Sequence, residues 1–128
     1  MPFVIDTSVA IHLRDKDPTI GGKLGSLDDV LLLSVISRVE LENGVRRDPA
    51  GAAERRARLD LMLAALPVLT FDTACADAYR AIVEAAGYSR RKLLDRLIGA
   101  QALVHRAKLV TLNAADFSDI PSLEVIAW

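Results

Sequence analysis

The sequence predicts an α/β fold with three layers, in which helices cover both faces of a central, mainly parallel sheet of about five strands. Short apolar segments of strand length alternate along the chain with longer segments of helical periodicity. Strands that alternate with helices in this way usually pair in parallel, because the helix provides the crossover connection. The chain has 128 residues, of which 52% are hydrophobic, so it can bury the core of a single domain spanning residues 1–128.

The first part of the chain predicts two strands, each followed by a helix. Phe3–Ile5 is short, apolar and partly β-branched, as in a buried strand. Asp6-Thr7-Ser8 supplies capping side chains for a short helix over Val9–Leu13. The length of Val30–Ile36 favours a second buried strand. Ser37-Arg38-Val39-Glu40 matches a capping box, so we expect the next helix to begin there.

A long helix, a third strand and another helix follow. Ala53–Leu66 has a strong helical pattern that Pro67 ends, because proline is not tolerated in a helix interior. Val68–Phe71 is the third strand candidate. The Asp72-Thr73 pair supplies a cap for the next helix, which we expect to end at Gly87.

The last part of the chain predicts one helix and two strands. Arg91–Arg106 is helical, because its apolar residues recur at the i, i+3 and i+4 spacing of a buried stripe. Leu109–Leu112 and Leu123–Ile126 are the fourth and fifth strand candidates.

The composition of the chain bears on which classes of protein it can belong to. The formal net charge of −1 gives no general attraction for nucleic acid, so any such binding must use local patches. The single Cys75 cannot form an internal disulfide, and we expect it to be a core residue. The longest apolar stretch, Val30–Ile36, is far shorter than the ~20 residues of a membrane span. No signal-peptide pattern is present, so we expect a soluble, cytoplasmic protein.

Four carboxylates lie beside or within apolar segments: Asp6, Glu40, Asp95 and Asp116. In a parallel α/β sheet, binding sites lie at the carboxyl ends of the strands, where Asp6, Glu40 and Asp116 are expected. Several carboxylates at one edge repel each other unless a cation joins them. The pattern therefore indicates a site for a hard cation such as Mg²⁺, with Mn²⁺ as the alternative.

Each acid also has a purely structural interpretation. Asp6 can cap the first helix, Glu40 can be the last residue of the capping box, and Asp116 can cap a turn. Asp95 is harder to explain in this way, because we expect it in the middle of a helix, where Asp is a poor helix former. Gly99 on its face also lets the helix approach a neighbour closely. Together, the four acids favour a functional cluster.

The segments around these acids resemble the ordered motifs of PIN-domain ribonucleases. They are Ile5-Asp6-Thr7-Ser8-Val9, Ser37-Arg38-Val39-Glu40-Leu41, Asp95-Arg96-Leu97-Ile98-Gly99-Ala100 and Val110-Thr111-Leu112-Asn113-Ala114-Ala115-Asp116-Phe117. The short chain and its ending over Ile120–Ile126 look like the VapC toxins of bacterial toxin–antitoxin pairs. The resemblance covers about Phe3 to Ile126. This sequence departs from the family at Gly99, where Ala is commoner, and at Leu112, where a polar or basic residue is common.

The resemblance implies a Mg²⁺-dependent endoribonuclease that hydrolyses RNA phosphodiester bonds. It implies Asp6 and Asp95 as the principal metal ligands. Asp116 is expected to be a further ligand, directly or through water, and Glu40 to be a ligand or to orient the attacking water. Hydrogen-bond partners that fix the carboxylate rotamers are expected at Thr7, Ser8 and Asn113.

Substrate contacts require cations, because an acidic site repels RNA. Arg90, Arg91 and Lys92 are the best candidates, since they precede the helix with Asp95; each Arg is also compatible with a solvated helix surface. The resemblance further implies a homodimer and an antitoxin partner. Leu61 is a candidate for an exposed apolar patch of the kind that marks protein interfaces.

Two other functions remain open from the sequence. The first is a catalytically silent PIN-type module that binds only RNA or protein, and the second is a metal-dependent phosphohydrolase. A nucleophilic mechanism has little support, because His12 and His105 lie in no catalytic motif.

Overall fold

A five-stranded parallel sheet forms the centre of the molecule, in the order β3-β2-β1-β4-β5. This computed structural model describes all residues from Met1 to Trp128. The strands are β1 (Phe3–Ile5), β2 (Leu31–Ser34), β3 (Val68–Leu69), β4 (Lys108–Thr111) and β5 (Val125–Ala127). The predicted fold class is confirmed, since the sheet has five strands with helices between them in sequence.

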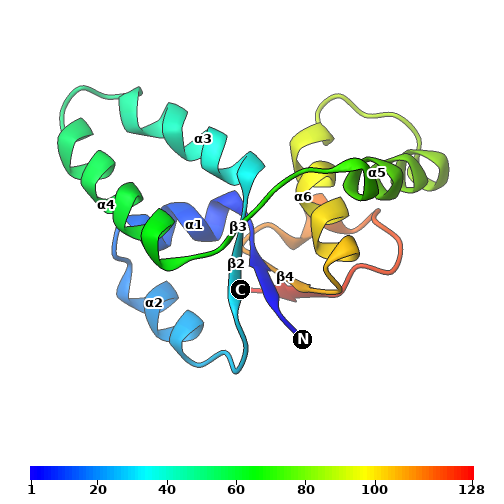
Figure 1. Cartoon of the computed structure of the whole chain (residues 1–128), viewed down its shortest axis with the longest axis horizontal. Helices are drawn as coiled ribbons and strands as arrows, with labels where there is room; N and C mark the ends of the chain where they lie inside the picture. Colours follow the sequence, from blue (N-terminus) through cyan, green and yellow to red (C-terminus); the bar gives the residue numbers. More distant parts are fainter.

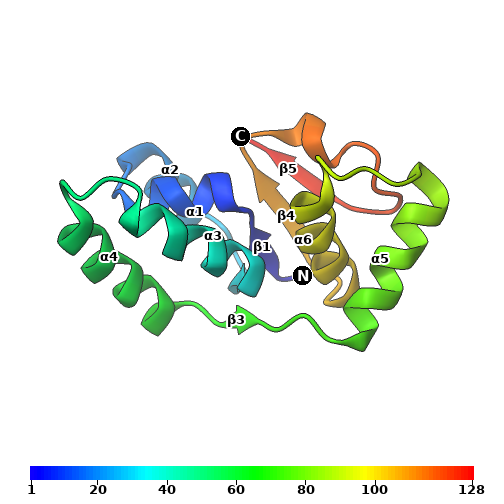
Figure 2. The same cartoon turned by 90° about the horizontal axis from the view of Figure 1, so that it is seen from above.

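Helices cover both faces of this sheet (Figures 1 and 2). One face carries α1 (Thr7–Arg14), α2 (Pro18–Gly25), α3 (Val35–Arg46) and α4 (Ala52–Ala65). The other face carries α5 (Thr73–Ala86) and α6 (Leu93–Val104). A short 3₁₀ helix, η1 (Ala114–Phe117), follows β4. No helix combines the length and the apolar character that crossing a membrane requires.

Alternate residues of β1 build two separate hydrophobic cores. Phe3 and Ile5 belong to the core beneath α1–α4, whereas Val4 belongs to the core beneath α5 and α6. Successive side chains of a strand point to opposite faces, so a central strand that is covered twice must be apolar throughout. All three residues of β1 are buried, and β1 pairs with β2 on one side and β4 on the other.

The start of α3 corrects the predicted capping box. The strand ends at Ser34, whose Oγ accepts from the backbone N–H of Ile36, so the helix begins at Val35 rather than after Ser37. Ser37 is instead a buried residue within the helix. The apolar run of Val30–Ile36 continues across the strand–helix boundary, and its β-branched residues resemble a strand even where they form the first turn.

The helix α2 was not predicted. Asp17 caps it by accepting hydrogen bonds from the backbone N–H groups of Thr19 and Ile20, and Pro18 occupies the first turn, where it is tolerated. Glycine is a poor helix former, and three of the eight residues of this helix are glycine. Tertiary packing of Ile20 and Leu24 into the core therefore outweighs the weak local propensity.

Gly99 lets α6 pack closely on the segment before β5, as its small size predicted. A Cβ atom at this position would lie 2.6 Å from Cδ1 of Ile120 and 3.6 Å from Cδ2 of Leu123. The close neighbours are thus side chains that are themselves part of the second core or packed against it.

Gln101 links α6 to the edge of the sheet. Its Nε2 donates to the carbonyl oxygens of Leu69 and Thr70 at 3.0 Å, and its Oε1 accepts from Oγ of Ser34. Strand β3 has only two residues and pairs with β2 on one side alone. The buried Gln101 amide therefore satisfies carbonyl groups at the end of an edge strand that has few ladder bonds of its own.

We expect Gln101→Leu to lower the free energy of unfolding by about 2 kcal/mol or more, because it leaves buried polar groups without partners. Urea unfolding followed by circular dichroism measures the change through the midpoint at unchanged slope. Asn43→Leu on the exposed face of α3 is the matched control and should change stability little. A Gln101→Leu protein as stable as the wild type would show that these bonds contribute nothing net.

Candidate functional site

Asp6 is the most firmly held of the four acids. It directly follows β1 and is 3% exposed. Its Oδ1 accepts from Oγ of Ser8 at 2.6 Å and from the backbone N–H of Val9 at 3.0 Å, so Asp6 also caps α1. Its Oδ2 accepts from Oγ1 of Thr111. The structural and the functional interpretations of Asp6 are therefore compatible, because the capping bonds fix its rotamer.

Thr111 is a contributor to the site that the sequence analysis missed. It is the last residue of β4 and is fully buried, and its Oγ1 also accepts from the backbone N–H of Asn113. Asn113 is exposed and enters this network only through its backbone, so the hydrogen bond to a carboxylate comes from Thr111 rather than from Asn113. A threonine at the carboxyl end of an otherwise apolar strand was the available signal.

Glu40 approaches the same sheet edge from α3. Its Oε1 accepts from Oγ1 of Thr7 at 2.7 Å, and Oγ of Ser37 lies 2.9 Å from the same Thr7 oxygen. Since Thr7 donates to Glu40, Ser37 donates to Thr7 in this chain. The buried Ser37 thus supports the carboxylate through Thr7, and its predicted role in a capping box is wrong.

Asp95 lies in the first turn of α6, not in the middle of a helix as predicted. A carboxylate in the first turn interacts favourably with the helix dipole, so poor helix propensity does not make this position unusual. The unusual feature of Asp95 is its electrostatic environment. Burial and, after it, the charges of Asp116, Asp6 and Glu40 together raise the pKa of Asp95 to about 6, whereas Lys92 acts to lower it.

Asp116 lies in η1, close enough to Asp95 for its charge to affect the pKa of that residue. Phe117, the next residue, is buried in the second core and anchors this turn. The Asp116 side chain is exposed and forms no hydrogen bond or ion pair within the chain. Among the charges that raise the Asp95 pKa, that of Asp116 is the largest, so the two carboxylates act on each other.

The four acids suit a hard cation because they offer carboxylate oxygens, not because of the distances between them. Carboxylate oxygens are the ligands that Mg²⁺ prefers, and the mutual repulsion at Asp95 is the kind that a cation relieves. No three acidic, histidine or cysteine side chains of the chain converge closely enough to hold an ion as a group.

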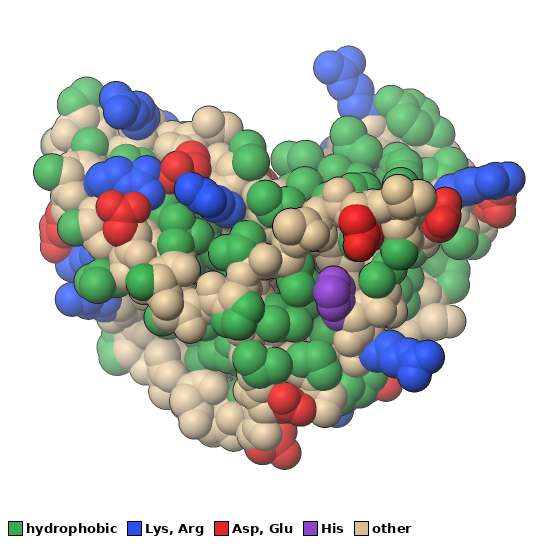
Figure 3. All heavy atoms as spheres, in the orientation of Figure 1, with side chains coloured by type: hydrophobic (Ala, Val, Ile, Leu, Met, Phe, Trp, Pro, Cys, Tyr) green, Lys and Arg blue, Asp and Glu red, His purple; other side chains and the backbone are tan.

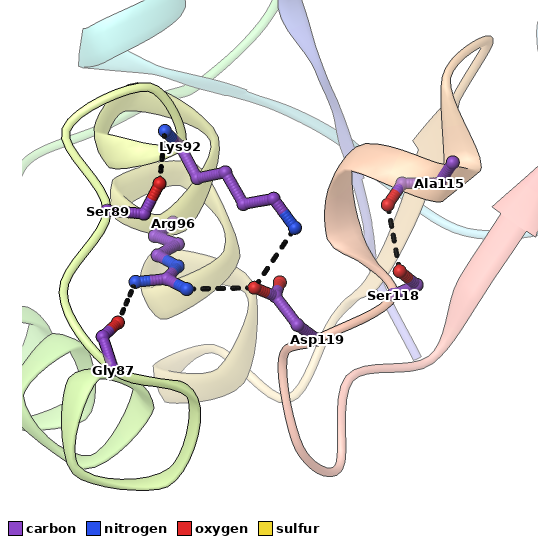
Figure 4. Close-up of polar contacts among 7 residues, drawn as sticks. All are labelled: Gly87, Ser89, Lys92, Arg96, Ala115, Ser118 and Asp119. Atoms are coloured by element: carbon purple, nitrogen blue, oxygen red, sulfur yellow. Dashed lines mark hydrogen bonds and ion pairs between the residues drawn. The ribbon is translucent and has the colours of Figure 1, made fainter.

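The cations near Asp95 form their own network (Figure 4). Lys92 Nζ lies 3.2 Å from Oδ2 of Asp119, and Nη2 of the buried Arg96 lies 2.8 Å from the same oxygen. Arg96 Nη1 also donates to the carbonyl oxygen of Gly87. Hydrogen bonds from Arg96 and Lys92 hold the pKa of Asp119 below its usual range. Lys92 is thus shared with Asp119, whereas Arg90 and Arg91 are exposed and form no ion pair.

The surface is hollowed between the two groups of helices. Figure 3 shows a notch between the lobe with α3 and α4 and the lobe with α5 and α6, and Lys and Arg side chains lie on both lobes. Strands β1 and β2 run toward this notch in the same view (Figure 1). The carboxyl edge of the sheet therefore faces a concave part of the surface.

Comparison with known proteins places this arrangement in a family. The chain is 27% identical to Ribonuclease VapC2 of Rickettsia felis, over 100% of this chain and 98% of that protein. Among solved structures, VapBC2 from Rickettsia felis bound to a promoter DNA fragment aligns with a TM-score of 0.85 and 26% identity, over 100% of this chain and 99% of that one.

A second solved structure shows likeness of fold alone. DNA-bound VapBC from Salmonella typhimurium aligns with a TM-score of 0.84 but only 22% identity, over 100% of this chain and 98% of that one. The PIN domain family matches residues 3–123. Because this match extends over nearly the whole sequence, the chain belongs to the PIN-domain family.

Proposed function

We propose that this protein is a metal-dependent endoribonuclease that acts as the toxin of a toxin–antitoxin pair. The observation that carries the proposal is the half-buried Asp95, whose pKa is raised first by burial and then by the charges of Asp116, Asp6 and Glu40. The likeness to Ribonuclease VapC2, along the full length of both chains, supports RNA as the substrate.

Asp6 and Asp95 would hold the cation, with Asp116 and Glu40 as further ligands or as partners of bound water. A bound Mg²⁺ or Mn²⁺ supplies an activated water and stabilises negative charge on the leaving oxygen. The chain's own residues prepare the site. Donors from Ser8, Val9 and Thr111 hold the rotamer of the buried Asp6, because their hydrogen bonds fix both of its carboxylate oxygens.

Thr7 has the corresponding role for Glu40. By donating to Oε1, it holds one carboxylate oxygen and leaves the other free to accept a proton or a hydrogen bond from water. Ser37 fixes the Thr7 hydroxyl in turn. The acids at this edge are therefore oriented by neighbours on α1, α3 and β4, and such support typically matters about 10–100-fold in metal affinity or activity.

We expect Asp6→Asn and Asp95→Asn each to lower the rate of RNA cleavage by about a hundredfold or more, because losing a ligand should exceed the loss of a supporting hydrogen bond. A labelled RNA incubated with Mg²⁺ or Mn²⁺ and resolved on a denaturing gel gives the rates. Asp77→Asn on α5 is the matched control, since this acid is exposed and lies outside the site. Wild-type cleavage by both site variants, free of contaminating nuclease, would refute the assignment and leave a silent binding module or another metal-dependent phosphohydrolase.

The raised Asp95 pKa predicts how the metal-free protein responds to pH. The folded pKa of about 6 exceeds the ordinary value of 3.8, so the folded state binds this proton more tightly than the unfolded state. That stabilisation is complete below pH 3.8 and is lost as the pH rises through about 6. Relative to Asp95→Asn, we expect metal-free wild type to lose about 1–2 kcal/mol over this window, a value reduced for the solvent screening of a half-buried group.

Thermal unfolding in EDTA across this pH range measures the difference. Adding Mg²⁺ at neutral pH should then raise the melting temperature of the wild type, because a ligand that binds only the folded state stabilises it. Asp6→Asn/Asp95→Asn protein serves as the control, and an equal increase there would mean that the ion binds elsewhere.

The antitoxin is expected to occupy an apolar cavity of about 350 Å³ between α1 and α4, whose lining includes Leu13, Leu31, Leu61, Met62 and Leu66. The solved structures that this chain resembles include a toxin–antitoxin complex from Klebsiella pneumoniae, which supports such a partner. Leu61 is 67% exposed, which agrees with its predicted place in an apolar patch and excludes the alternative of a buried Leu61. The remaining leucines of α4 pack against the core.

Leu61→Glu should weaken antitoxin binding by about tenfold or more, because the interface loses an apolar contact and gains a charge without a partner. Calorimetry with the purified antitoxin from the adjacent reading frame measures the affinity. Tyr88→Glu, exposed and outside this cavity, is the control. Unchanged antitoxin affinity of a folded Leu61→Glu protein would exclude this surface as the antitoxin site.

Light scattering of the same samples tests the expected homodimer. Finding only monomer at high concentration would contradict it.

A further inference from the structure

A second, basic cavity adjoins the acidic site. Its volume is about 460 Å³, and it lies among α1, α3, α4 and the loop that joins the last two. Thr7 and Glu40 form part of its wall, and no other cavity of the protein includes any of the four acids. The remaining polar lining comprises Arg14, Arg47, Arg55 and Asp48. The lining thus contains three guanidinium groups and two carboxylates, those of Glu40 and Asp48.

Arg14 is the central residue of this cavity. Its side chain is only 7% exposed, although it ends α1 at the protein surface. Its Nε and Nη2 donate to the neighbouring Asp15, whereas Nη1 forms no hydrogen bond within the chain. Nη1 is not among the enclosed polar atoms that lack a partner, so it is accessible and can donate to solvent or to a ligand in the cavity.

Gly44 makes room for Arg14 beneath α3. A Cβ atom at this position would lie 3.4 Å from Arg14 Nη1, and this is its only close neighbour. Glycine within a helix costs about 1 kcal/mol relative to alanine. Gly44 therefore leaves space next to the guanidinium where a larger side chain would narrow the cavity.

The other two arginines complete the basic wall. Arg55 reaches from α4 to the carbonyl oxygens of Val45 and Asp48, and this holds the loop between α3 and α4 in place. Arg47 is exposed and forms no ion pair with any carboxylate of the chain. One guanidinium is thus structural, whereas Arg14 and Arg47 both have donors available to a ligand.

We propose that this cavity binds a backbone phosphate of the RNA strand, next to the phosphate that is cleaved, with Arg14 and Arg47 as its donors. The inference rests on the proposed function, because the cleaved phosphate must lie at the carboxylates. A neighbouring phosphate then has to be held against the repulsion of the same acids. The Arg14 cavity supplies positive charge on the Glu40 side of the site, where the strand can continue without leaving the protein.

The test compares Arg14→Gln and Arg47→Gln with Arg80→Gln, which removes an exposed charge on α5. Fluorescence anisotropy with a labelled single-stranded RNA of random sequence, in EDTA across a salt series, gives affinities. Each site variant should bind about tenfold more weakly and lower the slope of log affinity against log salt by about 0.7, the value for one phosphate contact on a single strand. In the presence of Mg²⁺, the KM of each site variant for cleavage should rise by a larger factor than its kcat falls.

Arg47 is exposed, so its variant tests the proposal even if Arg14→Gln destabilises the fold, which thermal unfolding will show. If the wild type cleaves RNA and the folded Arg14→Gln and Arg47→Gln proteins keep its RNA affinity and salt slope, this inference is overturned. The proposed nuclease function is then unaffected. Loss of antitoxin affinity alone would also overturn this inference, because the cavity would then serve the protein partner. A wild type that neither binds nor cleaves RNA would instead refute the proposed function itself.

Discussion

The register of β1 between its two neighbours is the constraint on which the site depends. Ile5 pairs with Leu33 of β2 and with Val110 of β4, so the next residues along the three strands, Asp6, Ser34 and Thr111, lie side by side at one edge. A slip of one residue would turn every side chain of a strand to the opposite face. Because β1 is buried on both faces, its apolar packing fixes this register strongly. The hydrophobic core therefore determines which hydroxyl meets which carboxylate.

The acids differ in how the fold supports them. Asp6 accepts three hydrogen bonds and Glu40 accepts one from Thr7, so the protein fixes the orientation of both carboxylates. Asp95 accepts none, is half-buried, and experiences the repulsion of the other three. The protein thus supplies hydrogen bonds to two of these carboxylates and none to Asp95. Lys92 relieves Asp95 in part, but its ammonium group also pairs with Asp119.

Much of the fold could be predicted from periodicity, because long apolar patterns reflect burial directly, whereas Asp95 was expected in mid-helix and lies in the first turn of α6. Boundaries were less predictable. The cap at Ser34 lies inside an apolar run, and α2 has weak propensity that only packing of Ile20 and Leu24 offsets. Thr111 and the Arg96–Asp119 pair were missed because their partners are distant in sequence, so no local pattern marks them. The Arg14 cavity depends on contacts between α1 and α3 in the same way.

The bond from Thr111 to Asp6 joins residues 105 positions apart, and this has a consequence for how the protein is made. During synthesis, the central strand β1 emerges first but gains β4 as a neighbour only when most of the chain has been translated. Long-range parallel pairing is also among the slower steps in folding. A partly synthesised chain therefore carries Asp6 and Glu40 without their counterparts, and the acidic edge is assembled only when the final strands dock.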